Sequence, residues 1–369
     1  MPLPFLAVLL APPLAAVPAE PPADIRPYQS LHLELPYTPP IARIDGGDRL
    51  IYELHATNFS SRTLAITSVD VRVAADDKRV ARIDPAGTMR RIGAATGPTN
   101  HLAPGQRAIF YLSVPWSGDG AVPLVHHITF VPQRKEGASD PVTIAGAAFN
   151  PRPAFEARLG APLRGGPWTA VALPGVDNGH RRFPYAVRGR VHIPGRHAID
   201  WMPAVGFDPV STGTGVAPDG SGADVLAVAD AEIVTVKAER AADARANVED
   251  ETGAMIVLRL ADGRHAFYQH LAPGLRLRPG MRVRRGQVIG KVGASGHVTQ
   301  PHLHFHVADG PTPLDSEGLP YHFGAGRIAG RYTDKADFDA GKPWQAEMQR
   351  PIDGLPPANA VILFDPTTP

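Results

Sequence analysis

The chain has no cysteine among its 369 residues, and its charge is almost balanced. The absence of cysteine excludes disulfide scaffolds, thiolate zinc sites and cysteine nucleophiles. The 37 basic and 36 acidic side chains leave a formal net charge of +1. Because there is neither a strong net charge nor a long basic run, we expect no nucleic-acid partner and no anionic membrane surface as a partner.

Long apolar runs are also scarce, and the one that stands out begins the chain. Residues 3–17 are nearly all apolar, and small residues suited to cleavage follow at 17–19. This run is too short and too rich in proline to span a membrane. Its form is typical of a secretory signal peptide, with a disordered apolar leader as the alternative. We predict a signal peptide over 1–19, export to the periplasm or the extracellular space, and no membrane span.

Proline and glycine are abundant, with 40 and 37 copies, which favours turns and short strands over long helices. In the first part of the chain apolar side chains alternate with polar ones, and turn signals such as Asp45-Gly46-Gly47 separate the alternating segments. Alternation with a period of two is typical of strands with one buried face. The pattern predicts an immunoglobulin-like β-sandwich over residues 25–150. The alternating segments lie at 31–35, 50–56, 69–73 and 110–114.

The second part of the chain has a different composition. Asp262-Gly263 separates two apolar segments, which is a strong signal for a β-hairpin. We therefore predict an all-β protein whose second domain is a compact antiparallel β domain with loop insertions. The predicted divisions are a connector at 151–175, the second domain at 176–310 with insertions at 202–222 and 237–253, and a proline-rich extension at 311–369.

The most distinctive stretch is Pro301-His302-Leu303-His304-Phe305-His306. In an extended strand its three imidazoles would share one face, while Leu303 and Phe305 would face a core. Neutral histidine is the commonest metal ligand. The stretch predicts a strand that lines a metal site, and an exposed strand with incidental histidines is the alternative.

Other candidate ligands lie upstream of this strand. Asp200 is a lone acid in an apolar run, and a buried acid needs a partner. His180 precedes it, and His270 ends an apolar segment. Three nitrogen or oxygen ligands with one open position are what a catalytic zinc ion needs.

The order of an early histidine, Asp200, Tyr268-Gln269-His270-Leu271 and then residues 301–305 resembles the lysostaphin/LytM-type zinc metallopeptidases. Segments 225–230, 280–290 and 293–296 are also similar to that family, and the resemblance covers about residues 176–310. It implies a small all-β fold, the duplicated hybrid motif, with Zn²⁺ as cofactor and peptidoglycan peptides as substrate.

Carried over by position, Asp200 and His304 match metal ligands of the family, and His270 and His302 match its two catalytic histidines. The first ligand does not carry over directly, because the family often has a histidine four residues before the aspartate, where this chain has Arg196. His197 is one residue off, and such a shift turns a side chain to the opposite face.

Some relatives carry the first histidine further upstream, so we prefer His180 to His197, with His192 as a weaker candidate. The family commonly has glutamate where this chain has His306, which we do not count as a ligand.

The resemblance implies metal-assisted hydrolysis by a zinc metalloendopeptidase. Since no glutamate base accompanies the site, His270 and His302 are the candidates for proton transfer and for hydrogen bonding to the developing oxyanion. Two alternatives remain, a non-catalytic LytM-like module that binds the cell wall or activates a hydrolase, and a sugar-binding or structural β-protein. The oligomeric state and the peptide bond that is cut are not predicted.

Overall fold

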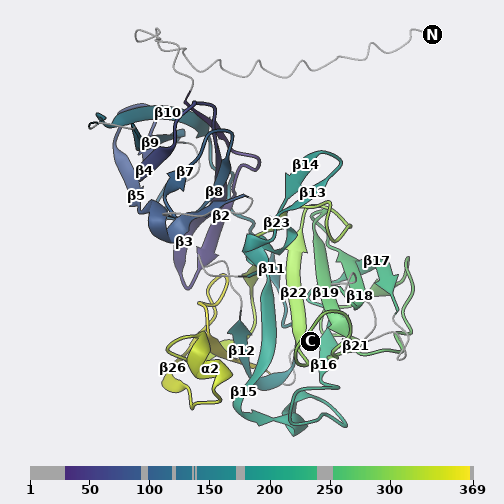
Figure 1. Ribbon diagram of the computed structural model, residues 1–369. Helices are drawn as coiled ribbons and strands as arrows, with labels where there is room; N and C mark the ends of the chain where they lie inside the picture. The colour runs from purple at the N-terminus through teal and green to yellow at the C-terminus, as the bar shows by residue number, and fades with distance from the viewer. Residues whose placement is uncertain are drawn as a thin grey trace, which may run out of the picture.

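The computed structural model describes residues 30–92, 99–118, 122–134, 137, 139–171, 179–238 and 252–365. Within these residues the chain is built almost entirely of β-strands, which confirms the all-β prediction (Figure 1). The predicted signal peptide and most of the predicted insertion at 237–253 lie outside the described residues. No helix in the described part of the chain is long and apolar enough to cross a membrane.

The N-terminal part forms two antiparallel sheets that share one core. The first sheet has the order β1-β3-β8-β6, with β2 beside β3, and the second has the order β10-β9-β4-β5, with β7 beside β4. Their strands are β1 (Leu31–Glu34), β2 (Ile41–Ile44), β3 (Gly47–Asn58), β6 (Met89–Arg91), β8 (Arg107–Pro115), β4 (Leu64–Val73), β5 (Arg79–Ile83), β7 (His101–Leu102), β9 (Leu124–Pro132) and β10 (Val142–Phe149).

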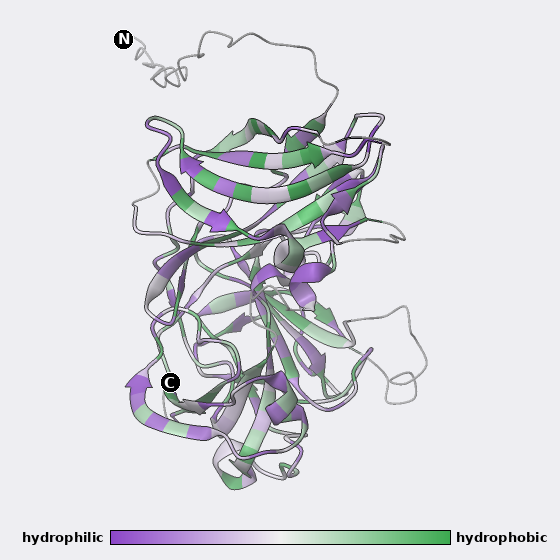
Figure 2. Cartoon of the chain, turned by 60° about the vertical axis from the view of Figure 1, so that its left-hand side comes forward, coloured by the Kyte–Doolittle hydropathy of each residue, from purple (hydrophilic) through white to green (hydrophobic). Residues whose placement is uncertain are grey.

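Alternating side chains explain why these sheets pack together. Leu54 and Phe110 from one sheet meet Val69 and Ile128 from the other in one buried cluster. Figure 2 shows hydrophobic and hydrophilic residues alternating along the strands of this part. The predicted β-sandwich is therefore present, while its immunoglobulin-like strand order stays a prediction.

A single large sheet dominates the rest of the molecule. Its order is β20-β17-β18-β19-β22-β15-β12-β27-β25-β26, with β23 beside β22. The strands are β12 (Gly165–Val171), β15 (Ile199–Asp208), β17 (Ala231–Lys237), β18 (Ala254–Arg259), β19 (His265–Leu271), β20 (Arg282–Val283), β22 (Leu303–Ala308), β23 (Gly318–Leu319), β25 (Arg327–Arg331), β26 (Gln345–Pro351) and β27 (Ala360–Phe364). The predicted Asp262-Gly263 hairpin joins β18 to β19, which are antiparallel partners.

Short elements complete the fold around this sheet. The two-stranded ribbons are β11 (Arg158–Leu159) with β24 (His322–Phe323), β13 (Tyr185–Val187) with β14 (Arg190–His192), and β16 (Asp224–Leu226) with β21 (Val288–Lys291). The helical turns are α1 (Pro85–Thr88), α2 (Lys335–Asp339), and the 3-10 turns η1 (His180–Arg182), η2 (Pro194–His197) and η3 (Pro209–Thr212).

Segments outside the predicted second domain also belong to the large sheet. The connector predicted at 151–175 contains β12, which pairs with β15 on one side and β27 on the other. The predicted extension at 311–369 supplies β25, β26 and β27. The start of the insertion predicted at 202–222 continues β15 as far as Asp208. Apolar strand residues such as Trp168 and Ile362, both fully buried, explain why these segments dock onto the sheet.

Candidate metal centre

Asp200 and His304 are direct partners across two central strands. Asp200 on β15 lies opposite His304 on β22 in the antiparallel register. Their neighbours Trp201 and Leu303 are fully buried in the core cluster, so alternation sends the two polar side chains to the other face of the sheet. There the Nδ1 atom of His304 donates to Oδ1 of Asp200 at 3.0 Å.

The third member of the group, His180, comes from the 3-10 turn η1. Its Nε2 atom donates to Oδ2 of Asp200 at 2.8 Å. One candidate ligand atom from each of His180, Asp200 and His304 lies within 4.8 Å of the other two. Two imidazoles and a carboxylate are a donor set that suits Zn²⁺.

Two further histidines stand next to this group with defined tautomers. His270 donates its Nδ1–H to the carbonyl of Ser295 at 2.9 Å, and His302 donates its Nδ1–H to the carbonyl of Gln300 at 2.9 Å. In the neutral tautomer that these bonds fix, Nε2 of each ring keeps a free lone pair. The two rings are in contact, with centroids 4.7 Å apart, and Nε2 of His302 lies 3.6 Å from Oδ1 of Asp200.

The backbone at His270 has an uncommon conformation. Its φ angle is +60°, a region that residues with side chains seldom occupy. Such angles persist where the surrounding structure enforces them, and they gather at functional sites. His270 lies near the end of β19, and its ring is in contact with that of His302 and 5.9 Å from that of His304, centroid to centroid.

Burial and neighbouring charges shift the pKa values of these groups in opposite directions. Burial alone would raise the pKa of Asp200, but His180, His304 and His302 outweigh it and hold that pKa well below its usual value. Burial lowers the pKa of His270 to about 3 and that of His304 to about 4. The site therefore combines an ionised Asp200 carboxylate with neutral imidazoles at His270 and His304, and a metal ligand must be free of its proton in the same way.

One family model matches part of the chain. Residues 210–316 match the model of peptidase family M23. Residues 210–316 therefore belong to an M23 peptidase domain. The matched span contains His270, His302 and His304, whereas His180 and Asp200 precede it. No curated protein matches the chain.

Several solved structures are distantly similar to the chain. The catalytic domain of the antimicrobial peptidase lysostaphin from Staphylococcus simulans is 22% identical, with 38% of this chain and 84% of that domain covered and a TM-score of 0.24. The catalytic domain of the prophage-encoded M23 protein EnpA from Enterococcus faecalis is 23% identical, with 43% and 92% covered and a TM-score of 0.28.

A zinc-containing peptidase from Vibrio cholerae is 17% identical, with 78% and 86% covered and a TM-score of 0.23. Similarity at this level has no bearing on activity, so the family assignment rests on residues 210–316.

A cavity of about 220 Å³ opens beside this group of histidines. His180, His270, His304 and His306 face it together with Gln269 and His297. His302 is not among the described residues that line the cavity; it packs beside the His270 ring instead. The remaining lining residues are Phe183, Tyr185, Pro194, Gly195, Thr252, Pro313 and Leu314.

The three candidates for the first metal ligand lie in different surroundings. His180 lies against Asp200, whereas His197 is buried at the end of η2 with no hydrogen-bond partner for either ring nitrogen among the described residues. His192 lies 3.4 Å from Asp315 and 3.3 Å from Glu317, away from Asp200. The choice of His180 over His197 thus agrees with the geometry, and its role as a ligand stays a prediction.

Two groups next to the candidate metal centre are not among the predicted ligands or catalytic residues. Ser295 is buried and holds the His270 ring through its carbonyl, while its hydroxyl donates to the carbonyl of Leu271. The Nδ1 atom of His306 lies 2.9 Å from Nε2 of His304, so His306 is a neighbour of a candidate ligand. The only sequence signal for Ser295 is the likeness of the turn at 293–296 to the family.

Proposed function

We propose that the chain is a zinc-dependent metalloendopeptidase that hydrolyses peptide bonds in the stem peptides or cross-bridges of peptidoglycan, after export to the periplasm or the extracellular space. The observation that carries this proposal is the convergence of His180, Asp200 and His304 within 4.8 Å, with His180 and His304 lining a cavity. The match to peptidase family M23 supports the reaction class.

In this proposal His180, Asp200 and His304 hold the metal. When bound, Zn²⁺ supplies a Lewis acid that polarises the scissile carbonyl and lowers the pKa of a water molecule. Nδ1 is the atom that His304 directs at Asp200, so we assign Nδ1 as its ligand atom. Asp200 contributes a carboxylate that stays ionised because its pKa is held low.

His270 and His302 supply the proton transfer. The carbonyls of Ser295 and Gln300 fix their Nδ1–H groups, so Nε2 is the atom available to accept a proton and later return it. Since Nε2 of His302 is 3.6 Å from the Asp200 carboxylate, the protonated ring would be stabilised by that charge. The histidine pair thereby replaces the glutamate base that the sequence lacks at this site.

Metal analysis together with digestion of purified peptidoglycan tests this proposal. We expect the His180→Ala and His304→Ala variants to lose both zinc and hydrolysis, whereas His197→Ala retains zinc. His270→Ala should retain zinc and lose about 100-fold or more in rate, because general acid–base catalysis contributes at least that much.

Two outcomes would reject the proposal. Zinc lost from His197→Ala but kept in His180→Ala would show that the first ligand is misassigned. A parent protein that holds zinc yet cuts neither peptidoglycan nor a model peptide would favour the activator module.

A further inference from the structure

A buried carboxylate from the sandwich reaches the segment that carries His180. Glu53 on β3 accepts from Nε of Arg181 at 2.6 Å through Oε1. The same guanidinium donates from Nη2 to the carbonyls of Tyr52 at 2.6 Å and Leu112 at 2.7 Å. Arg181 is fully buried and Glu53 is 3% exposed. The residue after His180 is therefore fixed to two strands of the sandwich.

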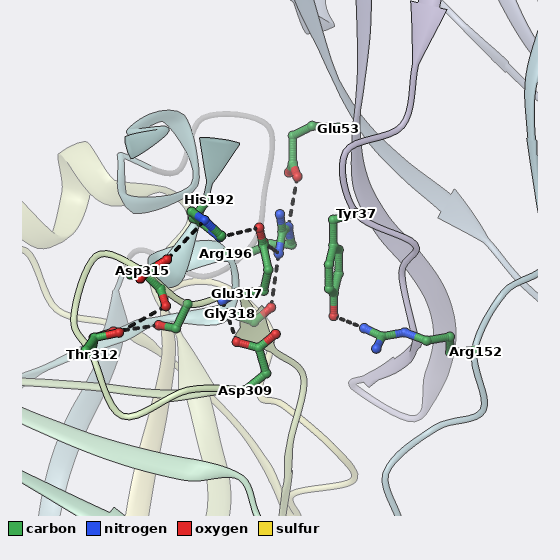
Figure 3. A network of polar contacts seen from close by, with 11 residues as sticks. Tyr37, Glu53, Arg152, His192, Arg196, Asp309, Thr312, Asp315, Glu317 and Gly318 are labelled. Atoms are coloured by element: carbon green, nitrogen blue, oxygen red, sulfur yellow. Dashed lines mark hydrogen bonds and ion pairs between the residues drawn. The ribbon is translucent and has the colours of Figure 1, made fainter. Parts of the chain in front are cut away.

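The second oxygen of Glu53 holds the neighbouring turn, η2. Oε2 accepts from Nε of Arg196 at 2.8 Å. Figure 3 shows Arg196 joined to Glu53 on one side and to the carbonyl of Gly318 on the other. Nη1 of Arg196 also lies 2.8 Å from Glu317. One carboxylate thus connects both 3-10 turns to the sandwich.

These two turns pack directly on each other at His180. A Cβ atom added at Gly195 on η2 would lie 2.9 Å from Cβ of His180, so glycine permits the close approach. In a 3-10 turn successive side chains point about 120° apart. On η1 this lets Arg181 enter the sandwich while His180 faces Asp200 on the large sheet.

We propose that the N-terminal sandwich is a positioning element of the metal centre, with Glu53 as the residue that sets the place of His180 through Arg181 and Arg196. This inference rests on the proposed function, because it assumes that His180 holds the metal. Asp200 and His304 are set by strand pairing within the large sheet. His180 has no strand to hold it, so its position depends on contacts made by the turn. The metal affinity should therefore respond to a change in the sandwich.

Zinc affinity of the full-length chain, measured by competition with a chelator, tests this inference. Glu53→Gln keeps the shape of the side chain and removes its charge. We expect it to weaken Zn²⁺ binding about 10- to 100-fold, the range seen when residues that orient metal ligands are removed. Arg181→Lys keeps the positive charge but cannot reach Glu53 and both carbonyls together, so it should weaken binding in the same direction and carries the test if Glu53→Gln does not fold.

Asp353→Asn is the matched control. Asp353 accepts two bonds from Arg43 of the sandwich, both at 2.8 Å, so the change also cuts an ion pair between the two parts of the molecule, but one that does not touch η1. We expect zinc affinity within about twofold of the parent. The readouts are circular dichroism and thermal unfolding for the fold, and zinc affinity for the centre.

The outcomes separate this inference from the proposed function. A folded Glu53→Gln or Arg181→Lys variant with the zinc affinity of the parent overturns the positioning role alone. Equal losses in Asp353→Asn and Glu53→Gln would also overturn it, because they would reflect loosening of the molecule in general. A parent protein that binds no Zn²⁺ overturns the proposed function and this inference with it, whereas one that binds zinc without hydrolysis overturns the proposed function only.

Discussion

His306 contacts His304 directly and is not itself a candidate ligand. Its ring stacks on Phe267, with centroids 4.5 Å apart and planes 9° apart. Nδ1 of His306 lies 2.9 Å from Nε2 of His304, so one proton is shared between the two atoms. If Nδ1 of His304 binds a metal, Nε2 must carry the proton and His306 must accept it. His306 would then select the ligating tautomer of His304.

Substitution of His306 tests this role. In His306→Phe the stacking surface is kept and the acceptor is lost, so we expect zinc affinity to fall about 10- to 100-fold. His306→Glu restores an acceptor of the type that the family commonly has there, and its affinity should stay close to that of the parent. Chelator competition measures both variants. Equal affinities for the phenylalanine and glutamate variants would contradict the role.

The sequence could predict part of the site at the scale of single residues. Alternation along 302–306 correctly placed the histidines on one face and Leu303 and Phe305 in the core, because this rule depends only on local geometry. The carbonyl of Ser295 was beyond prediction, since any residue type could supply that backbone acceptor. Only the close approach of residues 270 and 295 in space reveals it.

At the scale of elements, the approach of η2 to η1 depends on the lack of a side chain at Gly195. The φ angle of Gly195 is not in the left-handed region, so the backbone itself would accept alanine there. A new Cβ would nevertheless meet Cβ of His180 at 2.9 Å, closer than side chains pack, and one of the turns must move.

We therefore expect Gly195→Ala to weaken zinc binding by about tenfold, with a loss of stability of about 1–3 kcal/mol from overpacking. Chelator competition and urea unfolding measure the two effects. Gly87→Ala serves as the control, because a Cβ there would meet nothing within 4 Å. Unchanged zinc affinity in a folded Gly195→Ala variant would show that the turns do not set the position of His180.

Strands were easier to predict than these turns. Segments such as 50–56 and 69–73 show their period of two within a few residues, and both are strands in the structure. The turns η1 and η2 span three and four residues and have no such repeat. They are held by contacts with Glu53, more than a hundred residues away along the chain.

At the scale of the whole molecule, buried ion pairs join the sandwich to the part built on the large sheet. The large sheet takes strands from residues 165–171 and 360–364, on both sides of the predicted second domain, and the sandwich inserts Glu53 between two arginines next to it. Composition could place a change of fold near residue 150. It could not show that strands from outside the predicted second domain join the large sheet, or that Glu53 pairs with two arginines, because neither feature leaves a local pattern in the sequence.

The buried ion pairs predict how stability depends on pH. Burial alone would raise the pKa of Glu53, but Arg196 and Arg181 outweigh it and hold the folded-state pKa below the usual value of 4.5. The unfolded chain therefore takes up the proton first as the pH falls. The stabilisation is fully present above pH 4.5 and is lost as the pH falls through the folded-state pKa.

Urea unfolding of the metal-free protein between pH 7 and pH 3 measures this dependence. At pH 7 we expect Glu53→Gln to lower the free energy of unfolding by about 3–5 kcal/mol, because it leaves two buried guanidinium groups without their carboxylate. The difference from the parent should shrink as the pH falls below 4.5, because the unfolded parent then gains a proton on Glu53 and is stabilised relative to the folded protein. Asp353→Asn breaks a half-exposed pair and should cost no more than about 1 kcal/mol at any pH. A difference between Glu53→Gln and the parent that stays constant down to pH 3 would mean that Glu53 is not the ionised centre of this contact, and that the sandwich is held to the large sheet by packing instead.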